Sequence, residues 1–174
     1  MAHSTLPTFP MIIFGIVEPF LLTWAYVTGI RDPASYFAKQ IPGPPGSGGS
    51  AAAAFPPEAA SVTLQLVNVL LLLAPMAVVC CFSRDPATAR GYLFAVALAD
   101  YGHMYAIYRA VGHEVFFDVA RWNDMVAGGI GVSAVLNVLR WTTLLGVFGP
   151  IDGRRASGAL VGAGGAEGKG EKRE

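Results

Sequence analysis

Four long hydrophobic segments account for most of this chain, and each contains polar or ionisable residues near its middle. The segments cover residues 10–30, 59–82, 90–111 and 124–148, approximately. Their polar residues are Glu18 in the first, Gln65 and Asn68 in the second, Asp100 and His103 in the third, and Asn137 and Arg140 in the fourth. Because a charged side chain in hydrocarbon costs at least a few kcal/mol, such residues usually face the interior of a bundle. The pattern predicts a polar site inside a small membrane bundle.

The composition supports a membrane protein. The 174 residues are 53% hydrophobic and 14% charged, whereas about a quarter of the residues in a soluble domain are charged. A helix needs roughly 20 apolar residues to cross the hydrocarbon, and all four segments reach that length. We therefore expect an all-α fold, a four-helix transmembrane bundle that forms one domain over residues 1–152.

The remaining segments predict loops and an orientation. Residues 41–58 are rich in Pro, Gly and Ala and predict a flexible loop, and residues 153–174 predict a disordered tail. With four spans, the N-terminus, the 83–90 turn and the tail share one side, which holds seven Lys and Arg residues against three or four on the other. The positive-inside rule then places both termini in the cytosol.

Several function classes are excluded by composition and motifs. Twelve basic and twelve acidic residues give a formal net charge of zero, so nothing points to a nucleic-acid partner. No phosphate loop or metal-binding cluster occurs, so we expect neither a cofactor nor a metal. Cys80 and Cys81 are adjacent. Palmitoylation at a membrane edge is possible, and packing as two small apolar residues is the favoured interpretation.

Residue spacing indicates that the polar side chains share helix faces. These faces hold Ser61, Gln65 and Asn68 on the second segment, Asp100 and His103 on the third, and Gly129, Ser133, Asn137 and Arg140 on the fourth. On the first segment Pro19 loosens the helix beside Glu18. Tyr105 belongs to a tyrosine stripe on the third segment and could donate a hydrogen bond.

Two interpretations of these faces compete. In the structural one, Arg140 pairs with Asp100 or Glu18, and the amides bridge helices. In the functional one, which we favour, the residues form an acid–base site. One of Glu18 and Asp100 is a protonated acid, the other is a base, and His103 relays or orients the proton. Arg140, Asn137, Asn68, Gln65 and Tyr105 would bind or orient the substrate.

Three stretches carry a family resemblance. They are IVEPFLLTWAYVTGIRDPASYF, LADYGHMYAIYRAVG and WNDMVAGGIGVSAVLNVLRWTTLLGVFG. They resemble the DUF7704 family of small fungal four-span membrane proteins, over most of residues 10–149. The most recognisable pieces are Glu18-Pro19, the segment 100–103 and Arg140. The resemblance implies a fungal origin and a lipophilic substrate of secondary metabolism, and it does not fix the reaction.

The resulting hypothesis is an integral-membrane enzyme that acts on a lipophilic small molecule from the bilayer. Its reaction would be epoxide opening, by hydrolysis or cyclisation, or a related isomerisation. The alternative is a non-catalytic lipid-binding, scaffold or transport-accessory protein. Membrane lipids are expected partners in both cases, and a homo-oligomer is left open.

Overall fold

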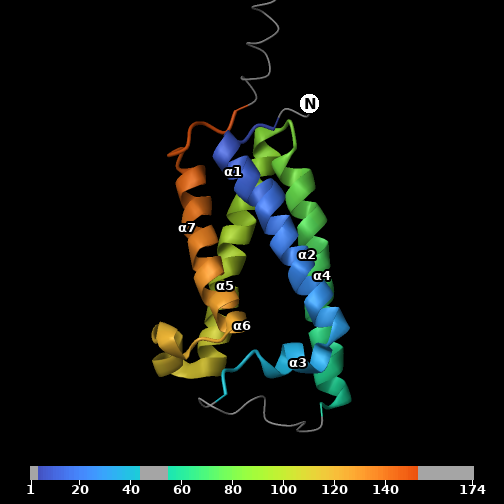
Figure 1. Cartoon of the computed structure of the whole chain (residues 1–174). Helices are drawn as coiled ribbons and strands as arrows, with labels where there is room; N and C mark the ends of the chain where they lie inside the picture. Colours follow the sequence, from blue (N-terminus) through green and yellow to red (C-terminus); the bar gives the residue numbers. More distant parts are fainter. Residues whose placement is uncertain (1–3, 44–54, 153–174) are drawn as a thin grey trace, which may run out of the picture.

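The computed structural model describes residues 4–43 and 55–152, and every regular element within these ranges is helical (Figure 1). The all-α fold expected from the sequence is thus confirmed for the described part of the chain. The predicted disordered tail, 153–174, lies outside the described residues, and so does most of the predicted loop 41–58. The last residues of that predicted loop are helical, because α4 (Pro57–Cys81) begins at Pro57.

The first hydrophobic segment forms one continuous helix in which a π-helical turn separates two α-helical parts. It consists of α1 (Thr8–Ile12), the π-helical turn η1 (Ile13–Val17) and α2 (Glu18–Arg31). A short helix, α3 (Pro33–Ala38), follows at once, and the Asp32 carboxylate caps it by accepting a hydrogen bond from the Ser35 N–H at 2.9 Å. α3 lies outside the four hydrophobic segments that predict helices.

The third segment forms the longest helix, α5 (Pro86–Phe117). Asp85 caps it by accepting hydrogen bonds from the N–H groups of Ala87 and Thr88, at 3.1 and 3.0 Å. A further bond from the Thr88 hydroxyl lowers the pKa of Asp85, so the cap is ionised at neutral pH. The uninterrupted part of the helix runs as far as Val111, near the end expected from the sequence; after a kink at Gly112 (φ 81°) the chain is helical again as far as Phe117. A positive φ is readily adopted only by glycine.

The fourth segment also contains a π-helical turn between two α-helical parts. After η2 (Val119–Arg121) it consists of α6 (Asp124–Val126), the π-helical turn η3 (Ala127–Val132) and α7 (Ser133–Leu144). The helix ends earlier than the predicted residue 148. Gly146 adopts a positive φ of 80° just beyond it, and this is a common way for a helix to terminate.

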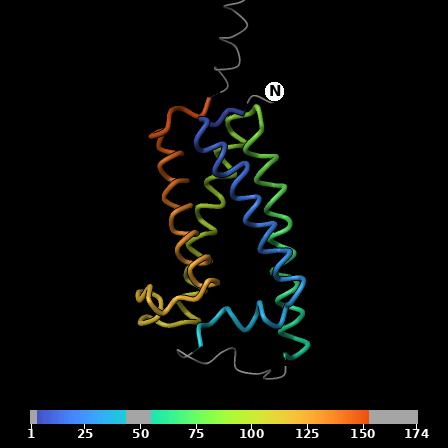
Figure 2. Tube along the Cα trace, in the orientation of Figure 1, coloured from blue at the N-terminus to red at the C-terminus, as the bar shows by residue number. Residues whose placement is uncertain are grey.

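The long helices form two packed pairs, α2 with α4 and α5 with α7 (Figures 1 and 2). The pairs meet at the end of the molecule that holds the N-terminal residues, and they diverge toward the end that holds α3. At the joined end the Ser4 hydroxyl donates to the Cys81 carbonyl, and the Arg90 guanidinium donates to the Ile151 carbonyl at 2.8 Å. A buried apolar core lies there and includes Phe14, Cys81, Leu93 and Ile151.

Both cysteines belong to this core and form no disulfide. Cys81 is completely buried and Cys80 is 8% exposed. Buried thiols of this kind behave as small apolar groups. The structure therefore agrees with the packing interpretation of the pair and places neither thiol at an open surface.

Large apolar side chains cover the outside of the helices. Phe20, Trp24, Leu72, Val79 and Val138 are each between 60 and 67% exposed. A surface of this kind suits lipid better than water. Three helices are long and apolar enough to cross a membrane: Thr8–Arg31, Pro57–Cys81 and Asp124–Leu144.

The predicted number of four spans is not matched by these three. The helix that falls short is α5, which is long enough but carries several polar and charged residues: Arg90, Asp100, His103 and Arg109. The same ionisable residues that drew attention in the sequence lower the apolar character of this helix.

Close packing of α2 on α4 gives a testable prediction at Gly29. A Cβ atom there would lie 2.5 Å from Cγ2 of Val67 and 3.2 Å from Cδ2 of Tyr36. Because a β-branched valine adapts poorly, Gly29→Ala should lower the free energy of unfolding by about 1–3 kcal/mol. Gly91→Ala is the matched control, since a Cβ there meets nothing within 4 Å. SDS-induced unfolding measures both, and equal stabilities would contradict the packing.

Candidate functional site

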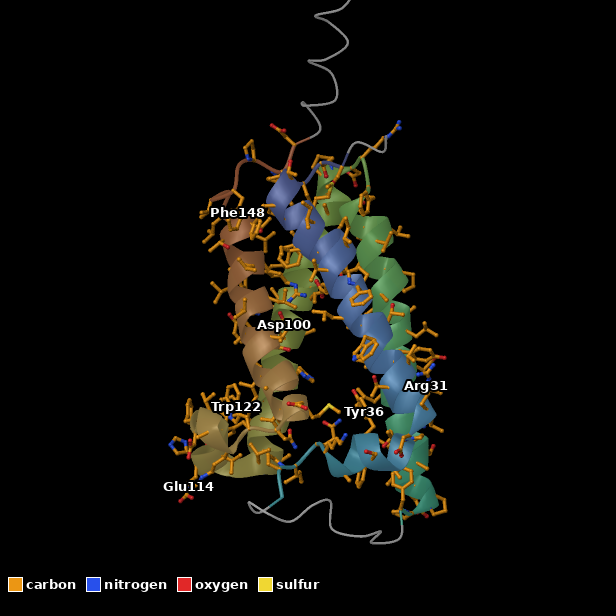
Figure 3. All side chains as sticks on the ribbon, viewed as in Figure 1. Arg31, Tyr36, Asp100, Glu114, Trp122 and Phe148 are labelled. Atoms are coloured by element: carbon orange, nitrogen blue, oxygen red, sulfur yellow. The ribbon has the colours of Figure 1, made fainter. Side chains whose placement is uncertain are left out.

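Arg140 of α7 is the centre of the polar cluster. Its side chain is 1% exposed, and its guanidinium donates to the carboxylates of Glu18 from α2 and Asp100 from α5. Figure 3 shows Asp100 about midway along the bundle, between the two helix pairs. Arg140 therefore joins one carboxylate from each pair, and three segments far apart in the sequence meet at a single guanidinium.

Asn137 lies one helical turn before Arg140 and extends the cluster. Its amide nitrogen donates to the Ala97 carbonyl at 2.7 Å and to Oδ2 of Asp100 at 3.2 Å. Oδ2 of Asp100 thus accepts from both Asn137 and Arg140. These bonds fix the carboxylate of Asp100 and join α5 to α7 at mid-length.

An aromatic ring supports the guanidinium. Cζ of Arg140 lies 5.3 Å from the ring centroid of Phe14, which is fully buried. A guanidinium over an aromatic face at this distance is a cation–π contact. Phe14 was not among the residues predicted from the sequence, because an aromatic residue in an apolar segment gives no polar signal.

The backbone beside Glu18 is shaped by η1. Its wide turn lets the Glu18 N–H bond to the Ile13 carbonyl, five residues earlier. Pro19 follows directly, and its ring cannot fit against a regular α-helical turn. Single π-helical turns inside α-helices are frequent at functional sites. The expected loosening of the helix by Pro19 thus corresponds to η1, which leads directly into Glu18.

Gly15 brings this helix close to α4. A Cβ atom at Gly15 would lie 2.9 Å from the Phe82 ring and 3.3 Å from Cβ of Cys81. The glycine therefore permits close packing one turn before Glu18, which is itself buried.

His103 lies beside the cluster and not within it. The carboxylate of Asp100 bonds to Arg140 and Asn137 rather than to His103, although both residues share one face of α5. The imidazole is exposed and lies against η3, where a Cβ added to Gly129 would be 3.5 Å from its Nε2. His103 is therefore a neighbour of the cluster on α5, with no hydrogen bond to Asp100 in the described structure.

Three predicted site residues do not join the cluster. Gln65 and Asn68 are exposed on α4, and the Gln65 amide donates to the Ser61 hydroxyl of its own helix at 3.1 Å. Tyr105 is 60% exposed. The structure therefore places Gln65 and Asn68 away from the polar layer that contains Glu18 and Asp100. The buried stripe of α4 lies on another face, which contains Thr63 and Val67.

Tyr92 is a polar residue of this region that sequence reasoning missed. Its hydroxyl is buried without a hydrogen-bond partner among the described residues, as are Oε2 of Glu18 and Nε of Arg140. Tyr92 belongs to the core at the joined end of the bundle, together with Phe14 and Cys81. A signal did exist in the sequence, since Tyr92 lies eight residues, about two helical turns, before Asp100.

The charges of the cluster do not balance. Two carboxylates and one guanidinium, all ionised, sum to −1 in a buried place, where an uncompensated charge costs several kcal/mol. One proton bound by either carboxyl group removes that charge. The described residues hold no group of three His, Cys, Asp or Glu side chains that could bind a metal ion.

Comparison with protein-family models matches residues 3–150 to the domain of unknown function DUF7704. The chain belongs to this family. The matched range contains all of the cluster residues and the four long helices. No curated protein and no solved structure matches the chain. The family description states no activity and no source, so the fungal origin expected from the sequence stays a prediction.

Proposed function

We propose that this DUF7704 protein is an integral-membrane enzyme that uses acid–base chemistry on a lipophilic substrate. The observation that supports it is the second carboxylate at Arg140. A structural ion pair needs one carboxylate for one guanidinium, and a second one in a buried place adds a net charge or holds a proton. Enzymes obtain acid and base from two carboxyl groups held in different surroundings.

The proposed placement puts all four long helices across the bilayer. α5 would be the fourth span, because Asp100 is turned toward Arg140 while Phe94 and Leu98 of the same helix are about half exposed. Both chain ends would lie on the cytosolic side, as the distribution of Lys and Arg predicts. The endoplasmic reticulum is the proposed compartment. A lipophilic substrate would enter from the bilayer.

The proposed reaction is the opening of an epoxide, by water or by a hydroxyl of the substrate, or a related isomerisation. Asp100 and His103 would face the substrate, because the Asp100 side chain is 13% exposed and that of Glu18 is 7% exposed. Glu18, Arg140 and Asn137 would position Asp100. A proton held by Asp100 passes to the epoxide oxygen as its C–O bond breaks. The nucleophile bonds to the carbon and gives its proton to His103, from which it returns to the carboxyl pair.

Isotope labelling tests this proposal. The purified protein in phosphatidylcholine vesicles is incubated with lipophilic epoxides and epoxy-polyenes in ¹⁸O-labelled water. Hydrolysis gives a diol that carries one labelled oxygen, whereas cyclisation gives an isomer of unchanged mass. Glu18→Gln is the comparison, since it removes one carboxylate and keeps the shape. Product at equal rates from both proteins, or none from the wild type, would contradict the proposal.

A second candidate function rests on the pairing itself. The guanidinium of Arg140 pairs with both carboxylates, so the cluster is able to hold the two helix pairs together in a lipid-binding, scaffold or transport-accessory protein. In that case, substitutions in the cluster change the stability of the protein and do not change the amount of any product. The labelling experiment separates the two candidates.

A further inference from the structure

The outer face of α4 carries a short polar stripe in an otherwise apolar surface. The stripe consists of Ser61, Gln65 and Asn68, all exposed, at spacings of four and three residues. At 100° per residue, Gln65 lies about 200° around the helix from Thr63, and Thr63 and Val67 are buried. The stripe therefore points away from α2.

The two amides of the stripe, Gln65 and Asn68, lie well away from the ends of the helix. α4 has 25 residues, so it is about 37 Å long. Asn68 is 11 residues beyond Pro57, which places it about 16 Å along the axis, near the middle. Once α4 spans a bilayer, as proposed above, the amides of Asn68 and Gln65 face hydrocarbon unless a protein covers them. Water cannot satisfy them at that depth.

Hydrogen bonds within α4 satisfy few of the donors and acceptors of the Gln65 and Asn68 amides. One N–H of Gln65 bonds to the Ser61 hydroxyl. A primary amide has two donors and a carbonyl oxygen with two lone pairs, so Gln65 keeps an acceptor and a second donor. The exposed amide of Asn68 has the same groups.

We propose that this stripe is the interface through which two copies of the chain associate, α4 against α4, within the membrane. A second copy fits because an amide is self-complementary: its N–H donates to the carbonyl oxygen of the same group opposite. The stripe is uncharged, so two copies do not repel each other. Asn and Gln side chains are known to join transmembrane helices by such bonds.

Membrane topology fixes the geometry of the pair. All copies insert in the same orientation, so the two α4 helices are parallel, and a two-fold axis lies along the membrane normal. Gln65 then faces Gln65 and Asn68 faces Asn68, each at one depth. Leu72 and Val79, which are 60 and 66% exposed, continue the same face toward the other end of the helix. The interface rests on the proposed membrane placement and not on the enzymatic activity.

Subunit counting in vesicles tests the interface. The full-length protein carries one fluorophore per chain, is diluted into phosphatidylcholine vesicles, and is counted by single-molecule photobleaching. We expect two bleaching steps for the wild type. For Gln65→Leu with Asn68→Leu, we expect mostly single steps, with the dissociation constant raised roughly tenfold or more. Tyr105→Leu is the control, because it removes another exposed polar group and should leave two steps. Single steps from the wild type would overturn the proposal.

Cross-linking checks the register and does not depend on activity. With a thiol oxidant in vesicles, Asn68→Cys should form a covalent dimer, whereas Val67→Cys, which faces α2, should not. The wild-type chain provides the baseline, since its own two thiols are buried. Dimer from Val67→Cys equal to that from Asn68→Cys would show that α4 does not meet α4 by this face. SDS-induced unfolding of each variant shows that it is folded.

Discussion

Arg140→Met is expected to lower the free energy of unfolding by about 3–5 kcal/mol. The guanidinium is buried and is the partner of both Glu18 and Asp100, so its removal leaves two carboxyl groups facing each other without a cation. It also removes the group that connects the α2–α4 pair to the α5–α7 pair. Methionine fills a similar volume without charge, so the loss reports the electrostatics more than a cavity. SDS-induced unfolding of the purified protein measures the change.

Two further variants show whether this loss comes from the cluster. Arg109→Met removes an exposed arginine from α5 and should change stability by less than about 0.5 kcal/mol. Arg140→Met combined with Glu18→Gln and Asp100→Asn neutralises the whole cluster and should recover much of the loss, because neutral groups have no buried charge left to compensate. An Arg140→Met protein as stable as Arg109→Met would show that the ion pairs do not hold the helix pairs together.

Asp100→Asn is expected to lower kcat by about 10²–10⁴-fold, the range that a positioned acid or base contributes. The amide keeps the size of the carboxyl group and still accepts a hydrogen bond from Arg140, so the bundle should remain folded. It can neither give nor take the proton that the proposed reaction moves. KM should change little, since the proposed lipophilic substrate would be bound chiefly by apolar surface. The rate of product formation in vesicles at varied substrate concentration gives both constants.

Tyr105→Phe is the matched control for this experiment. Both residues lie on α5, but Tyr105 is 60% exposed and contributes nothing to the cluster, so its variant should turn over at the wild-type rate. Unchanged turnover in Asp100→Asn would remove Asp100 from the reaction. Equal losses in both variants would point to a general disturbance of α5.

Much of the cluster could be anticipated from the sequence, because a charge in a long apolar helix is conspicuous. Glu18, Asp100, Asn137 and Arg140 stand out in this way, and the structure brings them together. The pairing of Arg140 with a carboxylate was also among the expected arrangements. Their catalytic roles stay predictions. Gln65 and Asn68 stood out for the same reason, but they lie on the outer face of α4. The sequence shows which residues share a helix face, but it does not show which neighbouring helix that face will contact.

The residues that the sequence could not indicate are the apolar and aromatic ones. Phe14 lies under Arg140, and Tyr92 is buried in the adjoining core. Both are aromatic residues of a kind common in membrane helices, so neither stands out in the sequence. The two π-helical turns were equally hidden, since a wider turn depends on how a helix packs. Only Pro19 pointed toward one of them.

By itself the sequence determined the long helices, their apolar character and the position of each polar residue along its helix, since these follow from composition and from a fixed rise per residue. It also determined which residues share a helix face. Tertiary structure alone decided which faces turn inward. That choice depends on how small residues such as Gly15 and Gly29 let helices approach, and on a guanidinium that requires partners from two different helices. Packing of α2 on α4 left Gln65 and Asn68 outside, and packing of α5 on α7 brought Asp100 to Arg140.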